Sequence, residues 1–350
     1  MSIYRYTLCR FTLPLGLILS TTAQACVTCG CSPSSDAALG FSAHSGWRVN
    51  VESNFINQNQ LRSGTEPISA TQAARINNAG GNQEVERDTI SRYTNLGIGY
   101  SPSVNWNFNL LIPYIDRSHT TYSNATTSQL TPANISGSDS NGLGDIKLIG
   151  SYQGLLPTHN FGLQIGIKLP TGRYGGQDIN TGATVGRNPV FFSSGSSASA
   201  GQALDASLQP GTGSTDLILG AYYYQALSQN FDVYANGQFQ AAVAENLNLP
   251  GANYRPGNLA SLSFGLRYEA NPEWVPQLQV NITHKSHDQG ALADTIGTGG
   301  TVAYLSPGMT LSLLSNIQVY GFVQLPVYSK LDGYQLFPRW TGTLGASYAF

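Results

Sequence analysis

Apolar and polar residues alternate with a period of two along most of the chain. Between Trp106 and Tyr114, for example, large apolar side chains recur at even positions, and asparagine occupies positions 105, 107 and 109. Successive side chains of a β-strand point to opposite faces, so each such segment has one apolar and one polar face. The pattern predicts about twelve strands, at 46–57, 91–101, 105–117, 142–155, 160–170, 214–227, 231–244, 259–270, 275–286, 300–313, 317–328 and 337–350.

The connections between these predicted strands are alternately short and long. Tight turns such as Ser101–Asn105 and Ser228–Asn230 alternate with long connections at 58–90, 118–141, 171–213, 245–258, 287–299 and 329–336. Outer-membrane barrels show this alternation, with short periplasmic turns and long outer loops. An even number of strands would place both ends of the barrel in the periplasm.

The composition narrows the class of protein. Charged residues make up only 10% of the 350 residues, and the net charge is −2. A soluble domain carries about 25% charged residues, and a nucleic-acid-binding protein carries a basic patch. The 19 Tyr, 13 Phe and 4 Trp argue against a disordered chain. We therefore expect no nucleic-acid partner and a β-rich protein in contact with something other than water.

The polar faces of the predicted strands consist mainly of Asn, Gln, Ser, Gly and Thr, unlike the Lys- and Glu-rich surface of a soluble sheet. Aromatic residues stand at the ends of the apolar stripes, as in the interfacial girdles of a membrane barrel. They are Tyr100, Trp106, Tyr114, Tyr152, Tyr268, Trp274, Trp340 and Tyr348. We predict an all-β fold, a transmembrane antiparallel up-and-down β-barrel whose apolar side chains face the lipid of the bacterial outer membrane.

The N-terminus indicates export. Arg5 and Arg10 precede an apolar stretch and the small-residue site Ala23-Gln-Ala25, a combination typical of a secretory signal peptide. The predicted organisation is a signal peptide at 1–25, a periplasmic cysteine-rich segment at 26–45 and the barrel at 46–350.

Three cysteines, Cys26, Cys29 and Cys31, would open the mature chain. Such a cluster can bind a soft metal ion such as Cu(I) or Zn(II). A disulfide is equally natural in the oxidising periplasm. A role as a plug or an anchor, including acylation at Cys26, is the third alternative, and no other cofactor is expected.

The chain ends in Ala346-Ser-Tyr-Ala-Phe350, which continues an apolar stripe through Trp340 and Leu344. This ending resembles the C-terminal strand signal of bacterial outer-membrane proteins. The resemblance implies that the barrel-assembly machinery is a partner of the strand that ends at Phe350.

Several short motifs, all but the last of which contain glycine, follow the second predicted hairpin. They are Gly142-Leu-Gly-Asp-Ile146, Gln164-Ile-Gly-Ile-Lys-Leu-Pro-Thr-Gly172, Gly211-Thr-Gly-Ser-Thr-Asp-Leu217, Leu305-Ser-Pro-Gly308 and Val323-Gln-Leu-Pro326. Over roughly residues 140–350 the chain thereby resembles the outer-membrane family labelled "MetA-pathway of phenol degradation". The resemblance implies a transporter or channel for small compounds, aromatic ones included, and fixes no substrate. We expect the motifs themselves to shape turns and strand ends.

Charged and aromatic residues on the polar faces are the candidates for the lining of a lumen. The charged candidates are Arg48, Glu52, Asp145, Lys147, Lys168, Asp216, Asp232, Arg267, Glu269, Lys285 and Arg339, and the aromatic ones are Tyr222, Tyr224, Tyr234, Tyr320 and Phe322. The charges nearly cancel, which argues against strong ion selectivity. The rings could stack a flat apolar solute. Alternatively, they fill a narrow barrel and the charges form ion-paired scaffolding.

These features predict a passive outer-membrane channel for small solutes, including aromatic or hydrophobic ones. One alternative is a surface scaffold or adhesin that acts through the long outer loops. Another is an outer-membrane hydrolase, but the chain offers no serine with an evident base to activate it. We therefore expect no enzymatic activity.

Overall fold

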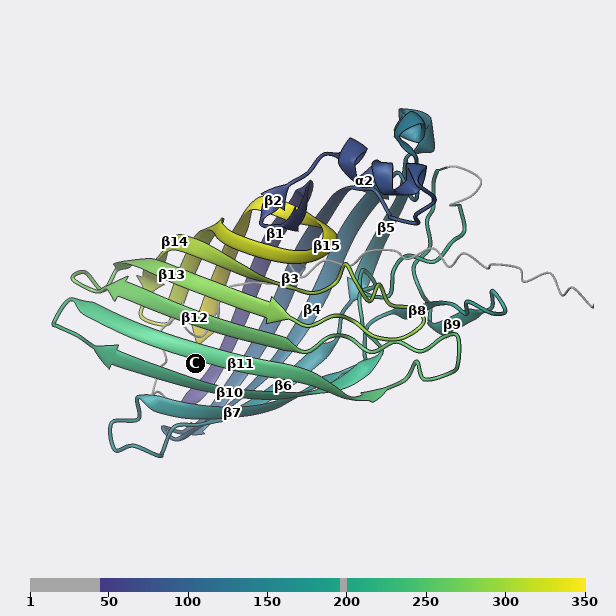
Figure 1. The fold of residues 1–350 in the computed structure, drawn as a ribbon. Helices are drawn as coiled ribbons and strands as arrows, with labels where there is room; N and C mark the ends of the chain where they lie inside the picture. The colour runs from purple at the N-terminus through teal and green to yellow at the C-terminus, as the bar shows by residue number, and fades with distance from the viewer. Residues whose placement is uncertain (1–44, 196–199) are drawn as a thin grey trace, which may run out of the picture.

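The computed structural model describes residues 45–195 and 200–350. Within them, eleven strands close into an antiparallel barrel in which β15 pairs with both β14 and β1 (Figure 1). These strands are β1 (Gly46–Gly64), β3 (Glu86–Ser103), β4 (Trp106–Thr121), β6 (Ile146–Tyr152), β7 (Phe161–Leu169), β10 (Ser214–Ala226), β11 (Phe231–Glu245), β12 (Leu259–Tyr268), β13 (Trp274–Lys285), β14 (Gly300–Leu314) and β15 (Ile317–Ala349). The predicted fold class is confirmed.

The last strand, β15, folds back on itself. Its first part pairs with β14 and its second part with β1, both antiparallel, and Leu331 has partners on both neighbours. The two ends of β15 meet where the Ala349 amide donates to the Asn316 carbonyl over 2.9 Å. Since β15 contributes two arms, the eleven strands provide twelve membrane-crossing segments, which agrees with the predicted number. Trp47 and Phe350 exchange backbone hydrogen bonds of 2.8 and 2.9 Å, so both ends of the barrel lie at the end with short turns.

The wall is higher on one side than on the other. The first part of β4 pairs with β6 and its outer part with β5 (Ser136–Leu143), which continues beyond the outer ends of β7 and β10. β1 and β3 also extend further than predicted, through 58–64 and 86–90. The predicted loops 118–141 and 329–336 likewise contain strand residues. These extensions lack the apolar alternation because, above the membrane, neither face of the sheet contacts lipid.

The outward face of the wall carries an apolar belt. Trp106, Phe108 and Tyr114 on β4 are 46, 48 and 45% exposed, whereas the inward-facing polar residues Glu52 and Gln58 of β1 are 3 and 0% exposed. An exposed apolar belt is stable in lipid and costly in water. The protein therefore resides in the outer membrane, with polar groups inside and apolar groups outside, as the sequence predicts.

The long connections contain the remaining elements. They are β2 (Glu66–Pro67), α2 (Ala70–Asn78), the 3-10 turns η1 (Thr127–Gln129) and η2 (Pro132–Asn134), and the hairpin of β8 (Tyr174–Gln177) and β9 (Thr184–Arg187). α2 was not predicted, and its start is fixed by Ser69, which forms a capping box with Gln72. No helix in the described part of the chain is long and apolar enough to cross a membrane. Figure 1 shows α2, β5, β8 and β9 at the same end of the barrel.

Candidate functional site

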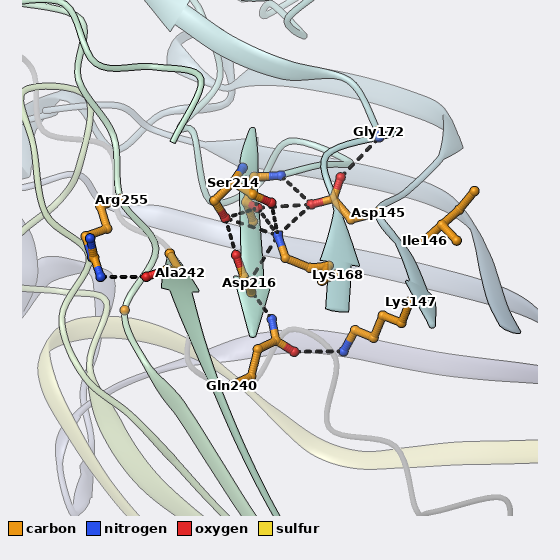
Figure 2. Close-up of polar contacts among 12 residues, drawn as sticks. Asp145, Ile146, Lys147, Lys168, Gly172, Ser214, Asp216, Gln240, Ala242 and Arg255 are labelled. Atoms are coloured by element: carbon orange, nitrogen blue, oxygen red, sulfur yellow. Dashed lines mark hydrogen bonds and ion pairs between the residues drawn. The ribbon is translucent and has the colours of Figure 1, made fainter. Parts of the chain in front are cut away.

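We call the connection between β7 and β10 (residues 170–213) the plug loop. Three of the glycine-containing motifs meet at its base. Asp145 joins them (Figure 2). Its carboxylate accepts hydrogen bonds from the backbone amides of Gly172 at 3.1 Å and Thr212 at 2.9 Å. It also accepts one from Lys168 Nζ at 2.9 Å. One carboxylate thus holds both ends of the plug loop.

Lys168 connects this carboxylate to a second one. Its Nζ lies 3.3 Å from Asp216 and 2.9 Å from Asp145, and all three side chains are almost fully buried. Asp216 in turn accepts a hydrogen bond of 2.6 Å from Gln240, whose carbonyl accepts one of 3.0 Å from Lys147 (Figure 2). Two lysines therefore balance two aspartates. We call Asp145, Lys147, Lys168 and Asp216 the loop-base network.

The glycines of the motifs allow the strands to converge on this network. A Cβ atom at Gly172 would lie 2.8 Å from the Gly211 Cα, and one at Gly211 would lie 2.6 Å from the Asp145 carboxylate. Contacts this short do not occur between real atoms, so a larger residue would separate the two ends of the plug loop. We expected these motifs to shape turns and strand ends, and the close approach of Gly172, Gly211 and Asp145 agrees with that role.

The plug loop lies against the inner face of the high side of the wall. Arg117, buried on β4, donates hydrogen bonds to the Leu208 carbonyl at 2.5 Å and to the Tyr93 hydroxyl at 2.6 Å. The backbone of Ser193 and Ser194 pairs with Gly137 of β5. The inner surface of the loop is an apolar cluster of Val190, Phe192, Leu204 and Leu208. The loop is therefore held in the outer mouth of the barrel.

Two further outer loops pack on the plug loop. Ala206 of the plug loop forms an apolar cluster with Leu247 and Tyr254, and Leu292 packs against it. Buried acidic groups accompany this cluster: Asp205, Asp288 and Asp294 are each less than a tenth exposed. Burial raises the pKa of the Asp205 carboxyl well above its usual range, and Asp288 and Asp294 raise it further. Burial also raises the pKa of Asp294.

The periplasmic half of the interior is built differently. Four of the predicted aromatic rings lie directly over a glycine, which belongs to a neighbouring strand in three cases and to the other arm of β15 in the case of Tyr320. A Cβ on any of these glycines would lie 2.1 to 2.3 Å from a ring atom. The pairs are Tyr222 with Gly162, Tyr234 with Gly265, Tyr320 with Gly345 and Phe322 with Gly308. The glycines let the rings lie flat on the wall, an arrangement known as aromatic rescue of glycine.

The hydroxyls of two of these tyrosines, Tyr222 and Tyr320, are anchored by polar groups of the wall. Tyr222 donates to the Gln153 side chain at 2.7 Å, and Tyr320 donates to Glu52 at 2.8 Å. Each hydrogen bond holds the hydroxyl end of the ring, and the glycine beneath allows the ring face to lie against the wall. We call the four rings the ring band.

The other predicted candidates are dispersed. Tyr224 donates to the His159 carbonyl in a periplasmic turn, and Asp232 interacts with Glu269. Glu269 pairs with Arg267 at 2.9 Å, and Lys285 pairs with Asp288 at 2.6 Å at the opposite, outer end. Arg48 is half-buried, close to Gly99.

Arg339 departs from the prediction, because it is exposed beside the exposed Trp340. The reason is an irregularity between β1 and β15, where Ile56 and Gln58 pair with Thr341 and Pro338. The extra residue on β15 breaks the alternation, so Arg339 and Trp340 are both exposed and both flanking residues are buried. A bulge of this kind has no clear sequence signal.

The hydrolase alternative gains little from the fold. His119 lies 2.8 Å from the Thr89 hydroxyl, and its Nε2 is 3.7 Å from Glu84, a proximity that the sequence did not reveal. The imidazole is only 1% exposed and lies beneath Phe192. Thr89, His119 and Glu84 therefore belong to the part of the wall on which the plug loop packs.

No group of histidine, cysteine, aspartate and glutamate residues in the described ranges has the arrangement of a metal site. The predicted signal peptide and the cluster of Cys26, Cys29 and Cys31 lie outside the described residues.

Comparison with known proteins supports the fold. Neither the protein-family models nor the curated proteins gave a match. The crystal structure of the COG4313 outer membrane channel from Pseudomonas putida F1 is similar, with 13% identity and a TM-score of 0.57, over 91% of this chain and all of that one. The β-domain of the Bordetella autotransporter BrkA has 11% identity and a TM-score of 0.48, over 88% of this chain and all of that one. The chain thus has the fold of an outer-membrane β-barrel.

Proposed function

We propose that the protein is a passive outer-membrane channel for small hydrophobic solutes, including aromatic ones. The observation that carries this proposal is the ring band, in which four inward rings lie flat on glycines of the wall. The four rings are 1 to 5% exposed, so a flat apolar solute would stack on their faces where the packing of the interior opens to admit it.

In this proposal the plug loop controls entry from the outside. A solute passes the outer mouth when the apolar contacts of the plug loop open, and the loop-base network keeps both ends of the loop in place. It then passes the ring band by diffusion. The balanced charges of the loop-base network give the passage little preference for either sign of ion. The chain needs no enzymatic activity or cofactor for this function.

The surface-scaffold alternative is less favoured because the longest loop packs inward. A scaffold or adhesin presents its loops to a partner, whereas Val190, Phe192 and Leu208 are buried within the plug loop and the Phe192 ring packs against His119 of the wall. Membership of the "MetA-pathway of phenol degradation" family remains part of the proposal. So do recognition of the strand ending at Phe350 by the barrel-assembly machinery and a metal- or redox-sensitive role for the segment 26–45.

Single-channel conductance in planar bilayers tests the proposal. We would compare the mature protein with a variant in which residues 174–210 are replaced by a short Gly-Ser linker, which keeps Gly172, Thr212 and the loop-base network. The linker variant should give larger and more persistent conductance steps. Uptake of a small aromatic solute into protein-containing vesicles should rise in parallel. A third variant with serine at Cys26, Cys29 and Cys31 tests whether the N-terminal segment also restricts the pore.

Folded protein can be distinguished from failed refolding by heat-modifiable migration in electrophoresis. If both folded proteins are silent and take up no solute, the channel proposal is wrong and the scaffold hypothesis becomes the better one. If the linker variant conducts no better than the wild type, the plug loop does not control entry.

A further inference from the structure

A groove of about 550 Å³ crosses the lipid-facing surface of the wall over β14, β15 and β1. Its rims are the exposed side chains of Met309, Val323 and Leu344. Its floor consists of three small residues, Ser53, Gly321 and Gly342. The groove lies within the apolar belt, and none of the charged candidates for the lumen lines it.

The packing of the wall does not require a glycine at position 321, whereas a Cβ atom at Gly342 would lie 3.3 Å from the Trp340 ring. A Cβ atom at Gly321 would meet its nearest neighbours at 3.6 and 3.7 Å, which is ordinary van der Waals contact. The ring band is different, because a Cβ on its glycines would collide with a ring. Packing within the chain therefore explains the glycines under the rings but not Gly321, whose absent side chain leaves room for a molecule from the membrane.

A basic group stands at the outer end of the groove. Phe55, which lines this end, pairs with Gly342 on one side and with Arg92 on the other. The Arg92 guanidinium lies 5.9 Å from the centre of the Phe55 ring, and the Trp340 ring lies 5.7 Å from that ring. Arg339, next to Trp340, is exposed as well. Aromatic and basic side chains together are typical of the interface between lipid tails and head groups.

The position of Arg92 identifies the leaflet. Its partner on β4 is Asp116, which follows Tyr114, the last aromatic residue of the outward stripe on that strand. Both lie toward the end with the long loops, the outer end of the barrel. Arg92 and Asp116 are 3.3 Å apart with side chains 53 and 50% exposed. Such an exposed ion pair is weak, so the guanidinium remains available to a phosphate.

We propose that this groove is a binding site for lipid A of the outer leaflet. One acyl chain lies in the groove, from Phe55 toward Pro307, and a phosphate of the head group binds Arg92. Phe55 on β1 and Pro307 on β14 are separated by both arms of β15. Three strand spacings amount to roughly 14 Å, a length suited to an acyl chain. Arginine binds phosphate in a bidentate manner and is the residue suited to this role.

Native mass spectrometry of the full mature barrel tests this proposal. Wild type, Gly321→Leu, Arg92→Gln and a control, Ala346→Leu, would be purified in mild detergent and mixed with lipid A or with dephosphorylated lipid A. Ala346 is exposed on the same strand, outside the groove. We expect Gly321→Leu to reduce binding of both lipids about tenfold. Arg92→Gln should reduce binding of lipid A about fivefold, the effect of one basic group near a charged lipid surface, without changing binding of the dephosphorylated form.

Three results would overturn the proposal. Equal binding by Gly321→Leu and Ala346→Leu would mean that the groove does not hold the acyl chain. Equal affinity of the wild type for lipid A and its dephosphorylated form would mean that Arg92 does not bind a phosphate of the head group. A wild-type dimer that dissociates in Gly321→Leu would mean that a second copy of the chain covers this face. Heat-modifiable migration of every variant ensures that a loss of binding is not a loss of fold.

Discussion

The outer and periplasmic halves of the barrel interior hold their polar groups in opposite ways. In the outer half, charged side chains bind one another and the backbone of a loop, as when Asp145 joins Gly172, Thr212 and Lys168. In the periplasmic half, neutral rings lie on glycines. Tyr222 and Tyr320 each donate a hydrogen bond to a side chain of the wall, Gln153 and Glu52 respectively. The outer half closes around its own chain, and in the periplasmic half neutral rings that are 1 to 5% exposed pack against the wall.

This difference separates two roles that the residue types alone do not distinguish. All of the charged and aromatic candidates face inward in the predicted alternation, yet the loop-base network holds the plug loop whereas the ring band packs on glycines of the wall. Buried ion pairs are costly to break and contribute little net stability. Their value here is geometric, because they fix where the plug loop begins and ends.

The largest effect should follow removal of the Asp145 carboxylate. Asp145→Ala leaves Lys168 with a single buried carboxylate and frees the amides of Gly172 and Thr212. Breaking a buried pair in this way costs about 3–5 kcal/mol. We expect a corresponding loss in the free energy of unfolding by urea, rapid cleavage of the plug loop by added protease, and larger conductance steps.

Glu245→Gln is the matched control for Asp145→Ala. Glu245 pairs with Arg255 at 2.6 Å, but both side chains are partly exposed. Exposed pairs contribute about 0–1 kcal/mol, so this variant should resemble the wild type. If Asp145→Ala leaves the plug loop as resistant to protease as Glu245→Gln does, the loop-base network does not hold the loop.

The alternation of residues was sufficient to predict the fold and the faces of the wall. Trp106 and Phe108 face lipid and Glu52 faces inward because burial in this protein follows a period of two. The convergence of Asp145, Gly172 and Thr212 could not be predicted, since it depends on where β6, β7 and β10 end relative to one another. Arg117 and Gln240 were missed for the same reason, because their roles arise from partners on distant strands.

The next largest effect should come from the glycines under the rings. Gly265→Ala places a methyl group 2.1 Å from the Tyr234 ring, which must then leave the wall. Overpacking of this kind costs about 1–3 kcal/mol. We expect a smaller conductance step, because the displaced ring enters the passage, and weaker uptake of an aromatic solute.

Gly97→Ala provides the comparison for Gly265→Ala. Gly97 is also buried, but an added Cβ would meet its nearest neighbour, the Asn50 Cβ, at an ordinary 3.6 Å. This variant should conduct like the wild type. An unchanged conductance in Gly265→Ala as well would mean that the ring band does not line the solute pathway.

A smaller effect is expected from pH, and it should act on the outer half alone. Burial raises the pKa values of Asp205 and Asp294 while the outer loops are packed together. A raised carboxyl pKa means that the packed loops bind protons more tightly than released loops do. Their closure is therefore favoured fully below the ordinary carboxyl pKa of about 3.9, and this contribution is lost as the pH rises through the raised values. The fraction of time spent open should increase several-fold between pH 4 and pH 8.

The double variant Asp205→Asn, Asp294→Asn tests the origin of this dependence. Without the two carboxyls, the open fraction should vary much less over the same pH range. A full pH response in the double variant would assign the effect to groups other than Asp205 and Asp294.

The smallest effect should follow loss of one hydroxyl from the ring band. Tyr222→Phe keeps the ring over Gly162 and removes the 2.7 Å hydrogen bond to Gln153. A neutral hydrogen bond contributes about 1 kcal/mol, so the free energy of unfolding should fall by about that amount while the conductance step stays unchanged. Gly162→Ala, which displaces the same ring, should reduce the conductance. If Tyr222→Phe reduces it equally, the hydroxyl itself contacts the permeating molecules, and the periplasmic half is a polar passage as well as an aromatic one.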